Sequence, residues 1–185
     1  MNTFKKFFGH LHTINKHKVL VFRHCFRAGI CFQGIKHDLS KYSLTEFVPG
    51  VKYYTGTHSP NEGERKDLGY SLAWIHHKGR NKHHFEYWID YPIRDKETGE
   101  VKAIPARMPN RYIVEMFMDR LAACKTYQKE AYTDASPLEY YQKGDISRFL
   151  HPKTQEILER LLKMNAKYGE EYTIQYIKAK LLRKK

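Results

Sequence analysis

Apolar residues recur every three or four positions between about Phe4 and Phe32, which is the spacing of one helix face. This pattern predicts one or two helices over the segment. The positions that carry it are Leu11, Ile14, Val19, Phe22, Phe26 and Ile30. Gly34 interrupts the pattern, and we expect His37 and Asp38 to lie on a short helical turn that follows it.

Two sequence signals mark the starts of further helices. Residues 43–46 (Ser-Leu-Thr-Glu) form a capping box, which predicts a helix through about Tyr54. Residues 59–62 (Ser-Pro-Asn-Glu) place serine at the N-cap and proline in the first turn. That helix should run to His77 or Lys78 and end at Gly79. Asn81 should then cap a short helix that carries His83, His84, Tyr87 and Trp88.

The pattern changes between residues 91 and 109, where three prolines and the run Asp-Lys-Glu-Thr-Gly predict a loop with a small β-hairpin. Asn110 begins another helix. The side chains expected on its buried side are Ile113, Val114, Phe117, Met118, Leu121 and Ala122. Residues 136–139 repeat the serine-proline-glutamate start signal, and residues 154–182 predict two amphipathic helices that separate near Gly169.

Together these elements predict a mostly α protein with a single helical domain over residues 1–185, a length that suits one domain. Its longest apolar stretches fall far short of the ~20 residues that span a bilayer. The first residues contain no apolar signal-peptide core. The three cysteines form no C-x-x-C motif and are expected to be reduced thiols, which favours a cytoplasmic protein.

The chain is strongly basic, with 33 Lys and Arg against 20 Asp and Glu and a net charge of +13. A surface of this charge attracts polyanions such as nucleotides or nucleic acid. Part of the excess lies at residues 178–185, the end of a predicted helix, where cations complement the helix dipole. The charge therefore supports an anionic partner without choosing one. The shortness of the apolar stretches predicts no membrane partner.

The adjacent pair His37 and Asp38 offers an imidazole nitrogen and a carboxylate oxygen, both good ligands for divalent transition metals. The pair is significant because further histidines surround it. They are His17 and His24 upstream, and His76, His77, His83 and His84 downstream. Asp119 follows on the predicted helix that begins at Asn110, where a buried acid would need a metal or a hydrogen-bonded partner. Glu115, one turn earlier, is an alternative to it.

This order of histidine, His-Asp doublet, middle histidines and late helical aspartate resembles the HD-domain superfamily of metal-dependent phosphohydrolases. The resemblance implies an HD-like helical bundle that binds one or two divalent ions, among Mn, Fe, Zn, Co, Ni or Mg. The implied metal ligands are His24 or His17, His37, Asp38, His77, His83, His84 and Asp119. His17 and His24 are two helical turns apart and share a face, and His24 is preferred because it lies nearer the doublet.

The resemblance also implies roles for nearby charged residues. Lys41, three residues after Asp38, is similar to the superfamily's lysine after the doublet, and these two residues are the candidate catalytic pair. Lys41, Arg80 and Lys82 are candidates to bind a substrate phosphate. The middle histidines favour a two-metal site, in which Asp38 is the best candidate for a bridge. Each adjacent histidine pair is also expected to contain one residue that does not bind metal directly.

The whole chain also resembles a family of uncharacterised bacterial and phage proteins. The shared segments are residues 37–42, 76–84 and 108–119. We therefore expect a metal-dependent phosphohydrolase or phosphodiesterase that acts on a nucleotide or a cyclic-nucleotide-like substrate through metal-activated water. The alternatives are a non-catalytic nucleic-acid-binding or phage–host interaction protein, and a di-iron oxygenase related to the HD superfamily. The H-E-x-x-H, P-loop and zinc-deaminase motifs do not occur.

Overall fold

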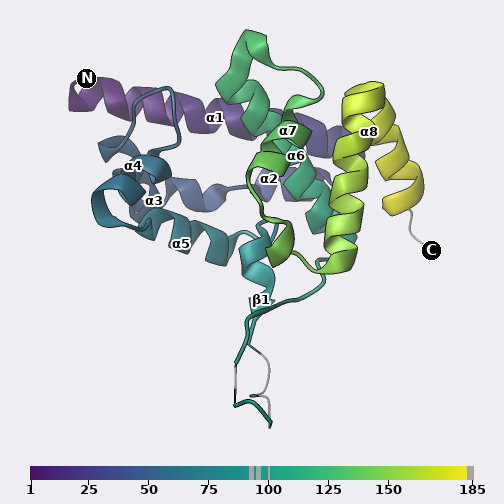
Figure 1. The fold of residues 1–185 in the computed structure, drawn as a ribbon. Helices are drawn as coiled ribbons and strands as arrows, with labels where there is room; N and C mark the ends of the chain where they lie inside the picture. Colours follow the sequence, from purple (N-terminus) through teal and green to yellow (C-terminus); the bar gives the residue numbers. More distant parts are fainter. Residues whose placement is uncertain (92–93, 95–96, 100, 183–185) are drawn as a thin grey trace. The chain divides into compact units, whose positions relative to one another are not determined.

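Helices make up most of the structure, a computed structural model that describes residues 1–91, 94, 97–99 and 101–182 (Figure 1). The predicted mostly α class is therefore confirmed. The elements are α1 (Thr3–Ala28), α2 (Cys31–Lys36), η1 (Leu39–Tyr42), α3 (Leu44–Lys52), α4 (Pro60–Leu68), α5 (Leu72–Arg80), η2 (Phe85–Trp88), β1 (Ile89–Asp90), β2 (Ile104–Pro105), α6 (Asn110–Gln128), η3 (Lys129–Ala131), α7 (Ser136–Lys143), η4 (Ser147–Phe149), α8 (Pro152–Tyr176) and η5 (Ile177–Leu181).

The described residues form two compact units. Unit 1 contains residues 1–81 and 118–132, and unit 2 contains residues 82–117 and the described residues from 133 onward. Helix α6 contributes residues to both units. The expectation of a single domain over residues 1–185 stays a prediction.

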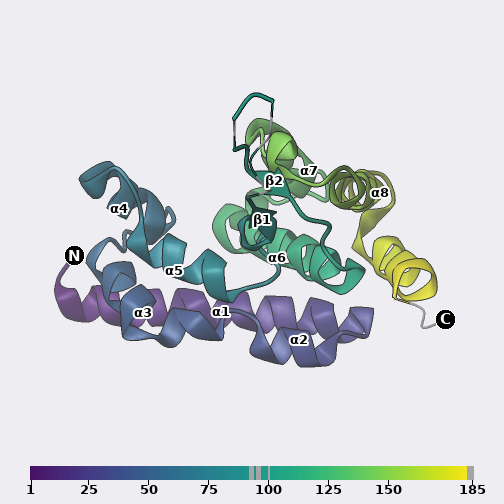
Figure 2. The ribbon, with the colours of Figure 1, turned by 90° about the horizontal axis from the view of Figure 1, so that it is seen from below.

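In unit 1 the first helical segment ends at Gly29, not at Gly34 as predicted. Gly29 has a left-handed backbone (φ 84°), and its N–H closes the last turn of α1 onto Cys25 and Phe26. Gly34 instead lies inside α2, where an added Cβ would come 2.7 Å from Cys25 Cβ. Glycine is therefore needed there for close approach of α2 to α1, and Figure 2 shows the two helices side by side.

The helix predicted from residue 59 to 77 is in fact two helices. Gly69 ends α4 in a left-handed conformation (φ 81°), and the Ser71 side chain then accepts a hydrogen bond from the N–H of Trp74 to cap α5. Helix α5 continues through Gly79 to Arg80, so Gly79 does not end it. Asn81 is consequently the C-cap of α5, not the N-cap of a following helix.

The expected short helix around His83 is a 3₁₀ turn, η2, which begins only at Phe85. Its strand neighbour β1 pairs antiparallel with β2, with Ile89 opposite Pro105. The predicted hairpin between residues 91 and 109 is thereby confirmed at its base. Residues 92–93, 95–96 and 100 of that excursion lie outside the described residues.

The predicted helix from Asn110 is present as α6, and the six apolar side chains expected on its buried side are completely buried. In unit 2, α8 packs against α7 and contributes Leu158, Leu161 and Leu162 to the core. Gly169 has an extended, positive-φ backbone (φ 79°, ψ 173°) that interrupts α8, so the predicted separation of two helices near this residue is confirmed. No helix among the described residues combines the length and apolar character needed to cross a bilayer.

Unit 1 buries a histidine between α1 and α3. The ring of His10 lies against the rings of Phe47 and Tyr54, and a Cβ added at Gly50 would overlap it. Burial, with a smaller contribution from the charge of Lys41, lowers the pKa of His10 from 6.5 to about 4. The folded protein therefore holds this ring neutral over a pH range in which the unfolded chain protonates it.

We expect His10 to make the fold acid-sensitive. Because the pKa is lowered on folding, stability is lost as the pH falls from about 6.5 to about 4, by about 2 kcal/mol after allowance for solvent screening. The His10→Phe variant should lose less stability over this range in urea denaturation at pH 7, 5.5 and 4.5. Replacement of the exposed His12 by Gln should leave the wild-type pH profile unchanged. An identical pH profile in His10→Phe and wild type would contradict the assignment.

Candidate metal centre

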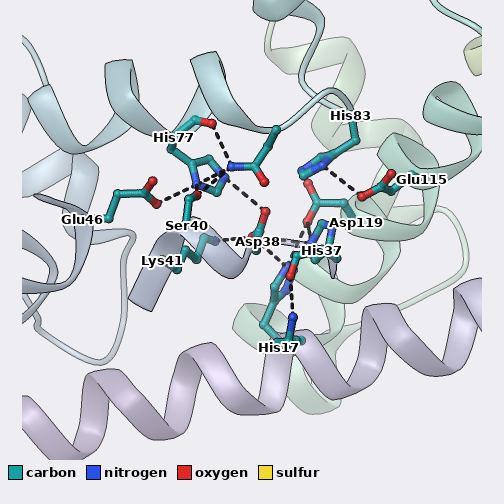
Figure 3. A network of polar contacts seen from close by, with 12 residues as sticks. His17, His37, Asp38, Ser40, Lys41, Glu46, His77, His83, Glu115 and Asp119 are labelled. Atoms are coloured by element: carbon teal, nitrogen blue, oxygen red, sulfur yellow. Dashed lines mark hydrogen bonds and ion pairs between the residues drawn. The ribbon is translucent and has the colours of Figure 1, made fainter. Parts of the chain in front are cut away.

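His37 and Asp38 lie between α2 and η1, where the backbone is not helical. His37 has an extended ψ of 127°, and Asp38 has a left-handed backbone (φ 53°, ψ 26°). Aspartate tolerates this region better than most residues, although a non-glycine residue there is uncommon. The expected helical turn begins one residue later, with Leu39 in η1. As a result the two side chains point to the same place, and His37 Nε2 lies 3.4 Å from Asp38 Oδ2 (Figure 3).

Two long helices contribute further polar side chains to this place. On α1, His17 Nε2 lies 2.9 Å from Asp119 Oδ1 of α6 and 4.0 Å from Asp38 Oδ2. His37 Nε2 lies 3.7 Å from the same Asp119 oxygen. These residues come from three segments that are far apart in sequence, and all belong to unit 1.

The other oxygen of Asp38 faces α5. His77 Nε2 lies 3.3 Å from Asp38 Oδ1, and the opposite ring nitrogen, Nδ1, lies 2.7 Å from Glu46 Oε2. We call His17, His37, Asp38, His77 and Asp119 the histidine–aspartate cluster. All but Asp119 are buried, and Asp119 retains a side-chain exposure of 20%.

Glu46 joins two neighbouring histidines of α5. Its Oε1 lies 2.6 Å from His76 Nδ1, while its Oε2 contacts His77. Arg80, one turn further along α5, donates from Nε to His76 Nε2 at 2.6 Å. His77 thus faces the cluster, whereas His76 faces Glu46 and Arg80. Which histidine of this pair binds metal directly stays a prediction.

Ser40 and Asn81 contact the same histidine at Nδ1, the nitrogen that also contacts Glu46. Asn81 Nδ2 donates to Ser40 Oγ and to the His77 carbonyl oxygen, each at 2.8 Å. Ser40 Oγ also lies 3.2 Å from His77 Nδ1. The ring of His77 is therefore fixed by groups from η1, α3 and the end of α5.

Lys41 supplies a positive charge at the cluster. Its Nζ lies 2.8 Å from Asp38 Oδ2, across the three-residue spacing of η1. Lys18 Nζ in addition donates to the His37 carbonyl oxygen at 2.6 Å, which fixes the backbone of the doublet. The predicted proximity of Lys41 and Asp38 is present, and the catalytic role of either residue stays a prediction.

The environment favours ionised Asp38. Burial raises the pKa of this carboxyl, but the charges of His37, Lys41 and His77 outweigh burial and hold the pKa well below its usual range. At His77, burial lowers the pKa, but Asp38 and Glu46 raise it to about 9. The pKa of Glu46 is lowered, because its contacts with His77 outweigh the effect of burial, which raises it. The cluster is thus a set of strongly interacting charges.

Unit 2 contains two further predicted ligands, His83 and His84. His83 is buried, and its Nδ1 lies 3.2 Å from Glu115 Oε1. The rings of His83 and His84 are 4.1 Å apart. A metal-binding role for either histidine stays a prediction. Glu115, the alternative to Asp119 in the sequence, is the partner of His83.

Two other predicted positions lie outside the histidine–aspartate cluster. His24 is buried on α1, two turns beyond His17, or about 10 Å along the helix axis. The 2.9 Å contact of His17 Nε2 with Asp119 Oδ1 makes His17 a candidate first ligand, and the choice between His17 and His24 stays a prediction. Lys82 lies in unit 2, where its Nζ is 5.6 Å from the centre of the Tyr87 ring. The phosphate-binding roles of Arg80 and Lys82 stay predictions.

The geometry of the cluster fits a divalent ion. Ligand atoms of His17, His37 and Asp119 all lie within 4.8 Å of one another. Two ligands bound ~2.1 Å from one ion are about 3.0 Å apart at neighbouring octahedral positions and about 3.4 Å apart at tetrahedral ones. The observed separations are 2.9 Å for His17–Asp119 and 3.4 Å for His37–Asp38, close to these values, and 3.7 Å for His37–Asp119 and 4.0 Å for His17–Asp38, which are longer. Imidazole and carboxylate ligands together suit Zn, Fe, Mn, Co or Ni.

Three residues at the cluster were missed in the sequence: Glu46, Ser40 and Asn81. The sequence places Glu46 in a capping box, but Ser43 makes no side-chain capping hydrogen bond to α3, and Glu46 turns instead to the histidines of α5. Asn81 was expected to cap a following helix. Helix-capping signals and metal-site carboxylates or amides use the same residue types, so the sequence alone could not separate these roles.

One protein family matches most of the chain. A family of unknown function, DUF5662, matches residues 6–164. The chain belongs to this family. The match spans α1 through the first half of α8 and so includes every residue of the histidine–aspartate cluster. It confirms the expectation of an uncharacterised family. No curated protein and no solved structure matches the chain.

The choice between His17 and His24 can be tested by metal content. We expect His17→Ala to reduce bound divalent metal strongly, because its Nε2 lies in the cluster. His24→Ala, a matched change on the same helix face, should retain wild-type stoichiometry. Elemental analysis and titration with Co²⁺, followed by its visible absorption bands, measure both. Metal loss in His24→Ala with full retention in His17→Ala would reverse the assignment.

Glu46 is expected to support metal binding through His77. Carboxylates that hold a ligating histidine typically contribute 10–100-fold in metal affinity. Glu46→Gln should therefore weaken Co²⁺ affinity by about 10-fold or more, because a neutral amide holds the His77 ring less strongly. Glu62→Gln, a change at an exposed carboxylate of α4, is the control. Equal Co²⁺ affinity in both variants would show that Glu46 does not support the site.

Proposed function

We propose that the protein is a metal-dependent phosphohydrolase or phosphodiesterase that acts on a nucleotide or a cyclic-nucleotide-like substrate. The observation that carries the proposal is the convergence of His17, His37, Asp38 and Asp119 within unit 1. These residues follow the order histidine, His-Asp doublet, late helical aspartate, which is the order of the HD-domain resemblance. The order of these residues in the sequence does not by itself bring their side chains together, because they come from three separate parts of the chain. Their proximity in the fold is therefore a separate observation.

The residues that would hold the metal are His17, His37, Asp38 and Asp119. A divalent ion held there would supply a water of lowered pKa and would stabilise negative charge on phosphoryl oxygens. The chain itself contributes preorganisation. His37 and Asp38 are fixed by the backbone between α2 and η1, and Lys18 holds the His37 carbonyl.

The two oxygens of Asp38 face different groups, which supports its proposed bridging role. Oδ2 faces His37 and Lys41, whereas Oδ1 faces His77. His77 also has the carboxylate contact at Nδ1 that is common for a metal-binding imidazole. A second ion beside His77 is therefore part of the proposal.

Lys41 is the proposed link between the ligands and the substrate. Its ammonium group lies 2.8 Å from Asp38 and keeps 33% of its side-chain surface exposed. An ammonium group has three N–H donors, so one contact with Asp38 leaves others for a phosphate oxygen. The net charge of +13 favours the approach of such an anionic substrate.

The proposal predicts metal-dependent turnover. Protein loaded with Mn²⁺, Co²⁺ or Fe²⁺ should hydrolyse a generic aryl phosphodiester or one of a panel of nucleotides, and dialysis against EDTA should abolish the activity. His37→Ala and Asp38→Ala should each reduce kcat by about 10³-fold or more, because each removes a proposed ligand. Lys41→Met should retain the metal and lose turnover or substrate affinity.

Controls separate this result from loss of the fold. His12→Ala removes an exposed histidine of α1 and should keep full activity. Circular dichroism and thermal melting should show that each variant is folded. If metal-loaded wild type hydrolyses none of these substrates, the hydrolase proposal is overturned. Oxygen consumption by the iron-loaded protein would instead support the oxygenase alternative.

A further inference from the structure

Helix α1 presents an unusual solvent face. The helix carries six Lys and Arg residues and no Asp or Glu over its 26 residues. Lys6 and Lys18 donate to carbonyl oxygens elsewhere in unit 1. Lys5, Lys16 and Arg23 are exposed, and no side chain among the described residues forms an ion pair with them. Helix α1 thus presents cations that the described part of the fold does not use.

These three cations lie along one line of the helix. At about 100° per residue, positions 16 and 23 fall within about 20° of position 5 around the axis. The line extends over 18 residues, or about 27 Å. The imidazole of His12 is on the same line and is exposed. Repulsion between cations in such a row disfavours the free protein slightly and is relieved by a polyanion.

A second line on the same face consists of exposed apolar side chains. Phe8, Val19 and Phe26 lie about 40–60° to one side of the cations. They are 51%, 47% and 63% exposed. Because the two phenylalanine rings and the neighbouring cations are exposed, packing inside unit 1 does not explain their presence together. We call the two lines together the α1 face.

We infer that the α1 face binds single-stranded nucleic acid. The cations match a chain of phosphates, and the exposed aromatic rings beside them offer stacking surfaces for unpaired bases. This binding surface lies beyond the proposed phosphohydrolase activity and does not depend on it. The buried His17 is on a different side of α1, about 120° away from Lys5.

A membrane is the less suitable partner. Helices that lie in a lipid surface bury a continuous apolar face. In α1 the continuous apolar side, with Ile14, Val21 and Cys25, is already buried in the protein. The exposed rings of Phe8 and Phe26 lie on one line but are 18 residues, or about 27 Å, apart, so they do not form a continuous apolar face.

Fluorescence anisotropy with a labelled 20-nucleotide oligo(dT), measured over a series of KCl concentrations, tests the inference. Wild type should bind with an affinity that falls steeply with salt. The triple variant Lys5→Gln, Lys16→Gln, Arg23→Gln should lower the magnitude of the slope of log K against log[KCl] by about 2, since each phosphate contact contributes ~0.7. Phe8→Ala with Phe26→Ala should weaken binding about 10-fold or more at each salt concentration and leave the slope unchanged.

The matched control removes three exposed cations from unit 2, by changing Arg148, Lys153 and Lys163 to Gln. It alters the net charge equally and should keep the wild-type slope. A wild-type slope in the α1 triple variant would overturn the inference. Binding of wild type to vesicles that contain phosphatidylserine, without binding to oligo(dT), would also overturn it and assign the face to a membrane.

Two further measurements separate this inference from the proposed function. Asp119→Ala should lose metal but bind oligo(dT) as wild type does. The α1 triple variant should keep its metal content and lose oligo(dT) affinity. Each variant should first show wild-type helicity and thermal melting. Metal content therefore tests the proposed metal site, and oligo(dT) affinity tests the α1 face. A negative result for one leaves the other proposal intact.

Discussion

The buried carboxylate of Asp38 is the constraint on which the architecture of unit 1 depends. Removal of an ionised carboxylate from water costs several kcal/mol unless positive charges and hydrogen bonds replace the solvent. Here Lys41, His37 and His77 provide that replacement; His37 and Lys41 lie in the same short segment as Asp38, and His77 lies on α5. The positions of η1 and α5 are thus connected through one side chain. A change at any of the three partners leaves a buried charge less well compensated.

Close helix packing makes this arrangement possible. Gly34 lets α2 approach α1, which places His37 and Asp38 directly beyond the end of α2. At the other end of α1, Gly50 of α3 leaves room for the ring of His10. The left-handed backbone of Asp38 is the local cost of turning both side chains to the same side. A strained residue at a cluster of charged groups agrees with a functional role for the doublet.

Helix α1 has two chemically different sides, and each belongs to one of the two proposals. Its buried side contributes His17 to the histidine–aspartate cluster. Its exposed side carries the cations and aromatic rings of the α1 face. A single rigid helix can therefore support a metal site and a surface for a polyanion at once, because residues about 120° apart on a helix do not compete for the same space. Substitutions on one side should leave the other largely unaffected.

The sequence alone determined the helical class, the hairpin between residues 91 and 109, the buried side of α6 and the break at Gly169. Each follows from local rules of periodicity or from a glycine with an unusual backbone. It also identified the His37–Asp38 doublet, His77 and Asp119 as candidate metal ligands. Tertiary structure was needed to favour His17 over His24, because both lie on one face of α1 and only the position of α6 distinguishes them. It was likewise needed to find Glu46, since a carboxylate three residues after a serine caps a helix or holds a histidine according to what packs beside it.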